Sequence, residues 1–164
     1  DLYLPYSGSI QLDGISLTDY DMDNYRFRTG ILLDDQALFA GTLMENITMG
    51  RQDIAYTDIM QLSAAVGLKS FIDRIPGGLN MQVPSGGKRL PRKIIQKIQL
   101  VRALACKPRL LLMDEPWLVL EKEVAEQVKS LLLERFKDTT LIIVTNDASF
   151  ADRCDQVIQL KGSN

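Results

Sequence analysis

The stretch Leu110-Leu111-Leu112-Met113-Asp114-Glu115-Pro116 decides the fold class, because an apolar run of strand length ends in two carboxylates and a proline. Such a run is typical of a parallel strand that is buried on both faces. Leu141-Ile142-Ile143-Val144 repeats the pattern and ends in Thr145-Asn146-Asp147. Between the two runs, residues 121–136 have the apolar periodicity of a helix. Strand, helix and strand in this order predict an α/β fold with a parallel sheet.

Shorter β elements flank these two strands along the chain. Asp13-Gly14 separates the apolar segments 9–12 and 15–17, which predicts a hairpin because glycine tolerates the positive φ of a tight turn. The composition of residues 29–33 predicts another strand, and that of residues 157–160 predicts a last one.

The middle third of the chain is mostly helical by its pattern. One helix is expected to begin with Thr57 as its cap and to stop at Gly67, and a second covers residues 69–75. The stretch 81–90, rich in glycine and proline, predicts a loop, and a third helix follows from Pro91 to Ala105. This order predicts a helical subdomain inserted in the sheet domain.

Composition excludes several kinds of chemistry. The 164 residues, 46% hydrophobic with a net charge of −2, are typical of one globular domain. Because the chain has no histidine, it cannot form a Ser-His-Asp triad or a histidine-ligated metal site. Cys106 and Cys154 are expected to be free thiols. The acidic pI of about 5.2 argues against general nucleic-acid binding. No apolar run reaches the roughly 20 residues of a membrane span, and no signal peptide opens the chain.

Three further stretches accompany the Asp-Glu-Pro strand in a fixed order. They are Pro5–Ile10 with Asp13-Gly14, Leu38–Ile47, and Leu100–Leu104 with Lys107-Pro108-Arg109. Together these stretches resemble the nucleotide-binding domain of ABC transporters, particularly exporters, from Leu4 to Gly162. The resemblance implies a RecA-like parallel-sheet core, residues 1–48 and 106–164, with a helical subdomain over 49–105.

The resemblance also implies cofactors and partners. In nucleotide hydrolases an aspartate placed like Asp114 holds Mg²⁺, also through water, and a glutamate placed like Glu115 polarises the attacking water. The residues alone leave another interpretation open, because acids at a strand end can also cap the following turn. The family's cofactors are ATP and Mg²⁺. Its partners are a transmembrane domain and a second nucleotide-binding domain, identical or not, at the cytoplasmic face of the cell membrane, and no nucleic acid is expected.

The phosphate-binding pattern of the family, G-x-x-x-x-G-K-[ST] (Walker A), is absent from the sequence. The pair Gly87-Lys88 is followed by Arg89, and Gln82 stands where the first glycine belongs. The pattern either lies upstream of a truncated chain, which we expect, or never existed in this protein. The 164 residues are then inactive alone and bind ATP weakly, since they lack the amide cradle and its lysine.

The signature position of the family falls on Leu90–Ile94, where Pro91, Arg92 and Lys93 replace a serine and two glycines. Pro91 lacks an N–H, and the two basic side chains fill the space that glycines leave open. Ser85-Gly86-Gly87-Lys88 then resembles the signature sequence of the family but does not stand at the signature position. The basic residues near this position form either a solvated helix face or a salvaged anion site; they are Lys88, Arg89, Arg92, Lys93 and Lys97.

Three other family positions are also changed. Asp34 stands at the glutamine of the Q-loop, with Gln36 two positions late, and Asn146 replaces the switch histidine. Glu121 stands at the D-loop aspartate. The preceding Leu118 and Val119 are either buried locally or part of an interface.

These changes predict an ATP-binding domain of an exporter that has a degenerate or asymmetric nucleotide site. The alternative is a structural or regulatory subunit that does not hydrolyse ATP. A third interpretation, the ATPase head of a chromosome-maintenance or repair protein, is less favoured, because the stretches 38–47 and 100–104 look exporter-like.

Overall fold

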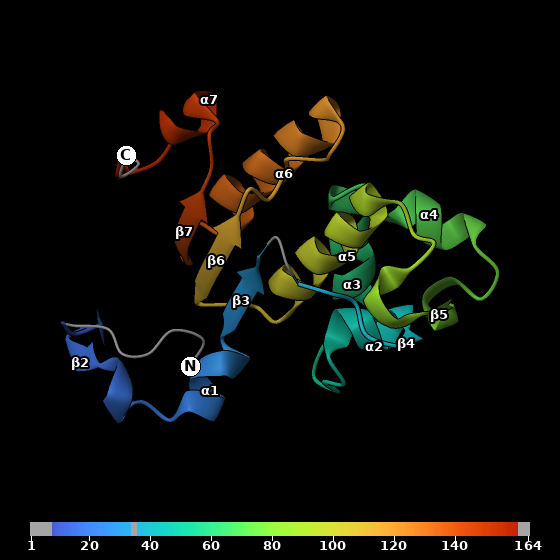
Figure 1. The fold of residues 1–164 in the computed structure, drawn as a ribbon, viewed down its shortest axis with the longest axis horizontal. Helices are drawn as coiled ribbons and strands as arrows, with labels where there is room; N and C mark the ends of the chain where they lie inside the picture. Colours follow the sequence, from blue (N-terminus) through green and yellow to red (C-terminus); the bar gives the residue numbers. More distant parts are fainter. Residues whose placement is uncertain (1–7, 34–35, 161–164) are drawn as a thin grey trace.

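A parallel sheet of three strands forms the centre of the computed structural model, which describes residues 8–33 and 36–160. The strands are β3 (Thr29–Leu32), β6 (Leu110–Asp114) and β7 (Thr140–Val144), in the order β3-β6-β7 (Figure 1). Helix α6 (Lys122–Arg135) connects β6 to β7, which makes the two strands parallel as predicted. The α/β class with a parallel sheet is therefore confirmed.

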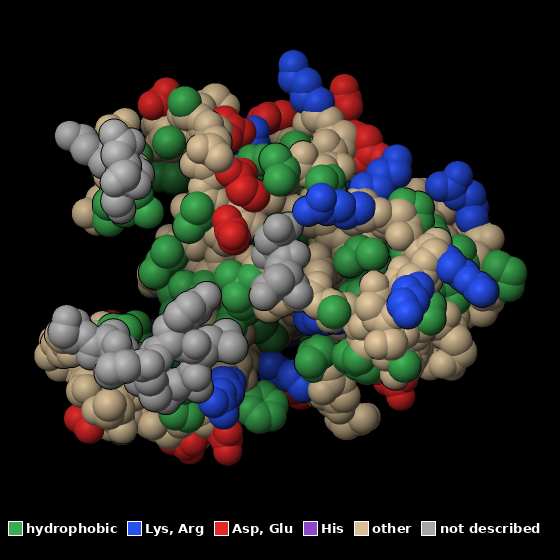
Figure 2. Space-filling model, viewed as in Figure 1, with side chains coloured by type: hydrophobic (Ala, Val, Ile, Leu, Met, Phe, Trp, Pro, Cys, Tyr) green, Lys and Arg blue, Asp and Glu red, His purple; other side chains and the backbone are tan. Residues whose placement is uncertain are grey.

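Only one face of this sheet is covered within the described residues. Leu111 and Met113 are at most 2% exposed, whereas Ile142 and Val144 on the other face are 54% and 55% exposed. Burial thus alternates along β6 and β7, and the expectation of strands buried on both faces is wrong for this part of the chain. Figure 2 shows hydrophobic side chains along a hollow between the N-terminal hairpin and the C-terminal segment.

The segment 157–160 does not form the predicted strand. Val157, Ile158 and Leu160 are 57%, 74% and 86% exposed, and no ladder joins them to a described strand. A strand is stable only beside a neighbour that accepts and donates its backbone hydrogen bonds, and apolar composition does not supply that neighbour.

The helical half packs around α5 (Arg92–Ala105), in which Ile98, Leu100 and Val101 are fully buried. Its start confirms the predicted boundary, since Pro91 is the N-cap residue. The other helices of this half are α2 (Leu43–Thr48), α3 (Tyr56–Ala65) and α4 (Lys69–Arg74).

Two local predictions in this half are wrong. Thr57 is not the cap, because the N-cap of α3 is Ala55, two residues earlier, and its side chain makes no capping hydrogen bond. The expected loop 81–90 contains a short strand, β5 (Gln82–Val83), that pairs with β4 (Gly41–Thr42). Two residues are too few to produce a readable alternation.

Short elements complete the described chain. The predicted hairpin is confirmed as β1 (Gln11–Leu12) and β2 (Ile15–Ser16). The remaining helices are α1 (Met22–Phe27), α7 (Ala148–Ala151) and the 3₁₀ turns η1 (Leu17–Asp19), η2 (Gly78–Asn80) and η3 (Ser85–Gly87). No helix among the described residues has the length and hydropathy of a membrane span.

Gly30 brings β3 and α5 into direct contact. A Cβ atom at this position would lie 2.2 Å from the carbonyl oxygen of Ala103 and 2.5 Å from a methyl group of Leu111. Real Cβ contacts are not this short, so only glycine fits, and the C-terminal half of α5 lies directly against the sheet.

Candidate functional site

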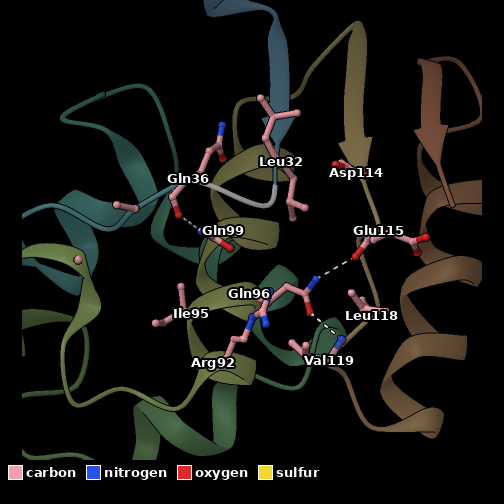
Figure 3. A pocket seen from close by; sticks show the side chains of 13 residues that line it. Leu32, Gln36, Arg92, Ile95, Gln96, Gln99, Asp114, Glu115, Leu118 and Val119 are labelled. Atoms are coloured by element: carbon pink, nitrogen blue, oxygen red, sulfur yellow. Dashed lines mark hydrogen bonds between the residues drawn. The ribbon is translucent and has the colours of Figure 1, made fainter. Parts of the chain in front are cut away.

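A cavity of about 260 Å³ lies at the carboxyl ends of β3 and β6, between the sheet and α5. Parallel α/β sheets bind ligands at this edge. Figure 3 shows polar residues from three segments around it: Gln36 from the loop after β3, Arg92, Gln96 and Gln99 from α5, and Asp114 at the end of β6 with Glu115 directly after it.

Glu115 is held by the segment that follows β7. Its Oε1 accepts hydrogen bonds from the backbone N and the Nδ2 of Asn146, both at 2.9 Å, and its Oε2 accepts one from Thr145 Oγ1 at 3.1 Å. The structure therefore brings together the two residues predicted at the catalytic and switch positions. The φ of Glu115 is 41°, a left-handed conformation that is uncommon for a residue other than glycine and costs of order 1–3 kcal/mol.

Asp114 ends β6 and lines the same cavity. Carboxylate oxygens are the ligands that Mg²⁺ prefers, and one or two of them with substrate phosphates make a typical site. The described residues contain no cluster of three metal-binding side chains. The donor set therefore fits a cation shared with a bound phosphate.

Gln36 reaches the cavity although it lies two positions after the expected Q-loop residue. Its backbone carbonyl accepts a hydrogen bond from Gln99 Nε2, and its own Oε1 is buried and has no hydrogen-bond partner among the described residues. An unpaired buried amide oxygen is a ready acceptor or cation ligand. Asp34, the residue at the Q-loop position, lies outside the described residues, and Gln36, the glutamine two positions later, lines the cavity.

Gln96 connects α5 to the segment that follows β6. Its Nε2 donates to the backbone carbonyl of Glu115 at 3.0 Å, and its Oε1 accepts from the backbone N of Val119 at 3.4 Å (Figure 3). One side chain thus holds both ends of the turn 115–119. A glutamine on a helix face carries no sequence signal for this role, so it was not predicted.

The signature position lies at the start of α5. Pro91 caps the helix without a side-chain hydrogen bond, and Arg92 lines the cavity. Lys93 Nζ lies 2.8 Å from Glu121 Oε1 and Lys97 Nζ lies 3.0 Å from its Oε2. Because Lys97 is only 5% exposed, the five basic residues do not form one solvated face.

Glu121, the D-loop position, is thus the shared partner of two lysines. The hydrogen bond from Lys93, then one from its own backbone and one from Lys97, lower the pKa of Glu121 to about 2. Within the described residues this carboxylate is engaged by α5 rather than directed into the cavity.

The Ser-Gly-Gly-Lys sequence is a tight turn away from the helix start. Gly86 has a φ of 73°, and its N–H donates to the Leu38 carbonyl oxygen at 2.7 Å. That amide therefore already has a backbone partner. Figure 2 shows most Lys and Arg side chains of the face in view over the helical half.

The exposure of Leu118 decides in part between local burial and an interface for Leu118 and Val119. It is 63% exposed at the rim of the cavity, so it is not buried locally, whereas Val119 is half-buried.

Comparisons with known proteins agree with this architecture. The family model described as "ABC transporter" matches residues 1–118. A multidrug efflux ATP-binding/permease protein of Mycobacterium tuberculosis is 31% identical over 159 residues, which are 97% of this chain and 13% of that protein. ABC transporter B family member 13 of Arabidopsis thaliana gives the same identity and coverage.

The fold is shared with a solved exporter. The structure of a bacterial Atm1-family ABC exporter with ATP bound superposes with a TM-score of 0.81 at 26% identity, over 90% of this chain and 26% of that one. Among the curated relatives described above, the chain spans only 13% of their length. The expected RecA-like core is consistent with this likeness. On the family match over residues 1–118 and the relatives at 31% identity, the chain belongs to the ABC transporter family.

Proposed function

We propose that this chain is the ATP-binding domain of an ABC exporter and that its nucleotide site is asymmetric. It supplies Asp114 and Glu115 to one ATP site and a degenerate signature, Pro91 to Lys93, to the other. The observation that carries the proposal is the fixed position of the Glu115 carboxylate, which Thr145 and Asn146 hold directly after the end of β6. Residues 49–105 act as the helical subdomain.

The hydrogen bonds of Glu115 leave room for a water molecule. An ionised carboxylate has about four acceptor sites, and three are used by Thr145 and Asn146. The remaining site accepts a hydrogen bond from a water molecule and so orients the water oxygen toward a phosphate. Because phosphoryl transfer depends on positioning, a fixed acceptor is what the step requires.

The cofactors implied are ATP and Mg²⁺. Asp114, which lines the cavity, would hold Mg²⁺ beside the phosphates. When bound, Mg²⁺ neutralises charge that develops on the transferred phosphate. A phosphate-binding loop, a second nucleotide-binding domain with an intact signature and a transmembrane domain complete the working protein at the cytoplasmic face of the membrane.

The test uses the whole transporter that contains this chain. Glu115→Gln should lower ATP turnover by a factor on the order of 10² or more while Mg-ATP binding, measured by calorimetry, is retained. Glu123→Gln is the matched control, because Glu123 is an exposed acid in the first turn of α6.

Equal turnover of the Glu115 variant and the parent would contradict the catalytic role. It would favour the alternative, a structural or regulatory subunit that does not hydrolyse ATP, which the changed positions Pro91, Glu121 and Asn146 already suggest. Absence of Mg-ATP binding by the parent transporter would contradict the proposed ATP-binding role.

A further inference from the structure

Lys129 on α6 is a buried lysine, only 5% exposed. An ammonium group loses its hydration on burial and requires compensating partners. Lys129 has three: its Nζ lies 2.7 Å from Glu126 Oε1, forms an ion pair with Asp147 Oδ2, and lies 5.3 Å from the centroid of the Trp117 ring. Burial works to lower the pKa of Lys129, and the bonds to Asp147 and Glu126 outweigh it, so the group stays charged.

Two of these partners lie in the segments that flank Glu115. Trp117 follows Glu115 by two residues, and Asp147 directly follows Asn146, whose two N–H groups hold the Glu115 carboxylate. Trp117 also packs edge-on against Phe150, with ring centroids 4.6 Å apart.

Asp147 fixes the position of the segment after β7. Its Oδ1 accepts hydrogen bonds from Ser149 Oγ at 2.6 Å and from the Phe150 N at 3.2 Å, which caps α7. Its Oδ2 contacts Lys129. Removing the lysine therefore leaves the end of this segment without its connection to α6.

We propose that Lys129 is a positioning residue for Glu115, because one buried ammonium holds both the Trp117 segment and the Asp147 end of the 145–147 segment. It touches neither substrate nor the Glu115 carboxylate. It fixes Asp147, and through the backbone Asn146, so that the two Asn146 N–H groups meet Glu115 Oε1. The role of Glu115 in hydrolysis rests on the proposed function. The contacts from Lys129 through Asp147 and Asn146 to Glu115 do not depend on it.

The experiment measures the Asn146 side-chain amide of the 164-residue chain by ¹H–¹⁵N NMR. Glu115→Ala, which removes the acceptor, defines the resonance of an unbound amide. Lys129→Met should move the Asn146 resonance toward that position. Glu126→Gln is the matched control, since it removes the partner of Lys129 on α6 and leaves Asp147 in place; it should leave the Asn146 resonance at the parent position.

A second variant keeps the test decisive if Lys129→Met does not fold. Asp147→Asn retains an oxygen for Ser149 and Phe150 and removes the charge that meets Lys129; it should move the Asn146 resonance in the same direction. An unchanged resonance in a folded Lys129→Met or Asp147→Asn variant would overturn the proposal. So would an equal displacement in Glu126→Gln. Because no nucleotide is present, this outcome is independent of whether Glu115→Gln impairs turnover.

Discussion

Glu121 stabilises the start of α5 by accepting two ammonium groups. Glu121→Gln leaves Lys97, at 5% exposure, without its anionic partner, and should lower the free energy of unfolding by about 1–2 kcal/mol at pH 7. The pKa of Glu121 is lowered from 4.5 to about 2, so this contribution is present above pH 4.5 and is lost as the pH falls through about 2. Urea unfolding of parent and variant at several pH values measures the difference.

The matched substitution is Glu123→Gln in the first turn of α6, two residues after Glu121, which should change stability by no more than about 0.5 kcal/mol. A Glu121 variant as stable as the parent at pH 7, or a difference that persists undiminished near pH 2, would contradict the ion cluster.

Residue types at the site could be predicted and their partners could not. The apolar run before Asp114 and Glu115 predicts that they lie at a strand end, and the structure puts them at the cavity. That Gln36 lines the cavity could not be predicted. The family pattern gives only a number of positions along the chain, and this number does not fix the conformation of the loop. The Lys129–Asp147 contact joins residues 18 positions apart, which no local pattern encodes.

At the scale of elements, α5 holds the turn 115–119 through Gln96. Gln96→Leu leaves the Glu115 carbonyl and the Val119 N–H without this partner, and should cost about 1–3 kcal/mol because both groups are partly buried. The Val119 amide should exchange with solvent faster. Gln127→Leu, on the exposed side of α6, is the control and should change neither quantity. Unchanged Val119 exchange in the Gln96 variant would refute the connection.

Long, strongly patterned elements are predicted well. The strands at 110–114 and 140–144 and the helix α5 follow from continuous apolar runs and from Pro91, which depend only on local chemistry. The segment 157–160 has an equally apolar composition and is not a strand, because pairing depends on a neighbour that its own residues do not specify. The open face of the sheet escapes prediction for the same reason.

At the scale of the whole molecule, the 164 residues by themselves should not hydrolyse ATP. They lack the G-x-x-x-x-G-K-[ST] pattern, and electrostatic positioning of the phosphates supplies most of the catalysis of phosphoryl transfer. Affinity for Mg-ATP should be millimolar at best, on the order expected when the amide cradle and its lysine are missing. Calorimetric titration that shows micromolar binding would contradict this.

The exposed sheet face should make the same 164 residues associate. Ile142 and Val144 are more than half exposed side by side on a parallel strand, and apolar sheet surfaces of this kind favour contact between copies. Ile142→Thr should reduce the concentration dependence of the sedimentation coefficient. Tyr56→Ser, which replaces a 61% exposed ring on α3, should not. Equal behaviour of the two variants would refute a specific role of this face.

The contact at Gly30 determines where the helical half can pivot. The carbonyl of Ala103 lies against the backbone of β3, so the C-terminal end of α5 has almost no freedom to translate. Arg92, eleven residues earlier in the same helix, is about 16 Å from this point. A rotation of α5 by about 10° would therefore move the start of the helix by about 3 Å and its end hardly at all. The centre of such a rotation is the contact between the Ala103 carbonyl and Gly30, which exists only because glycine has no side chain.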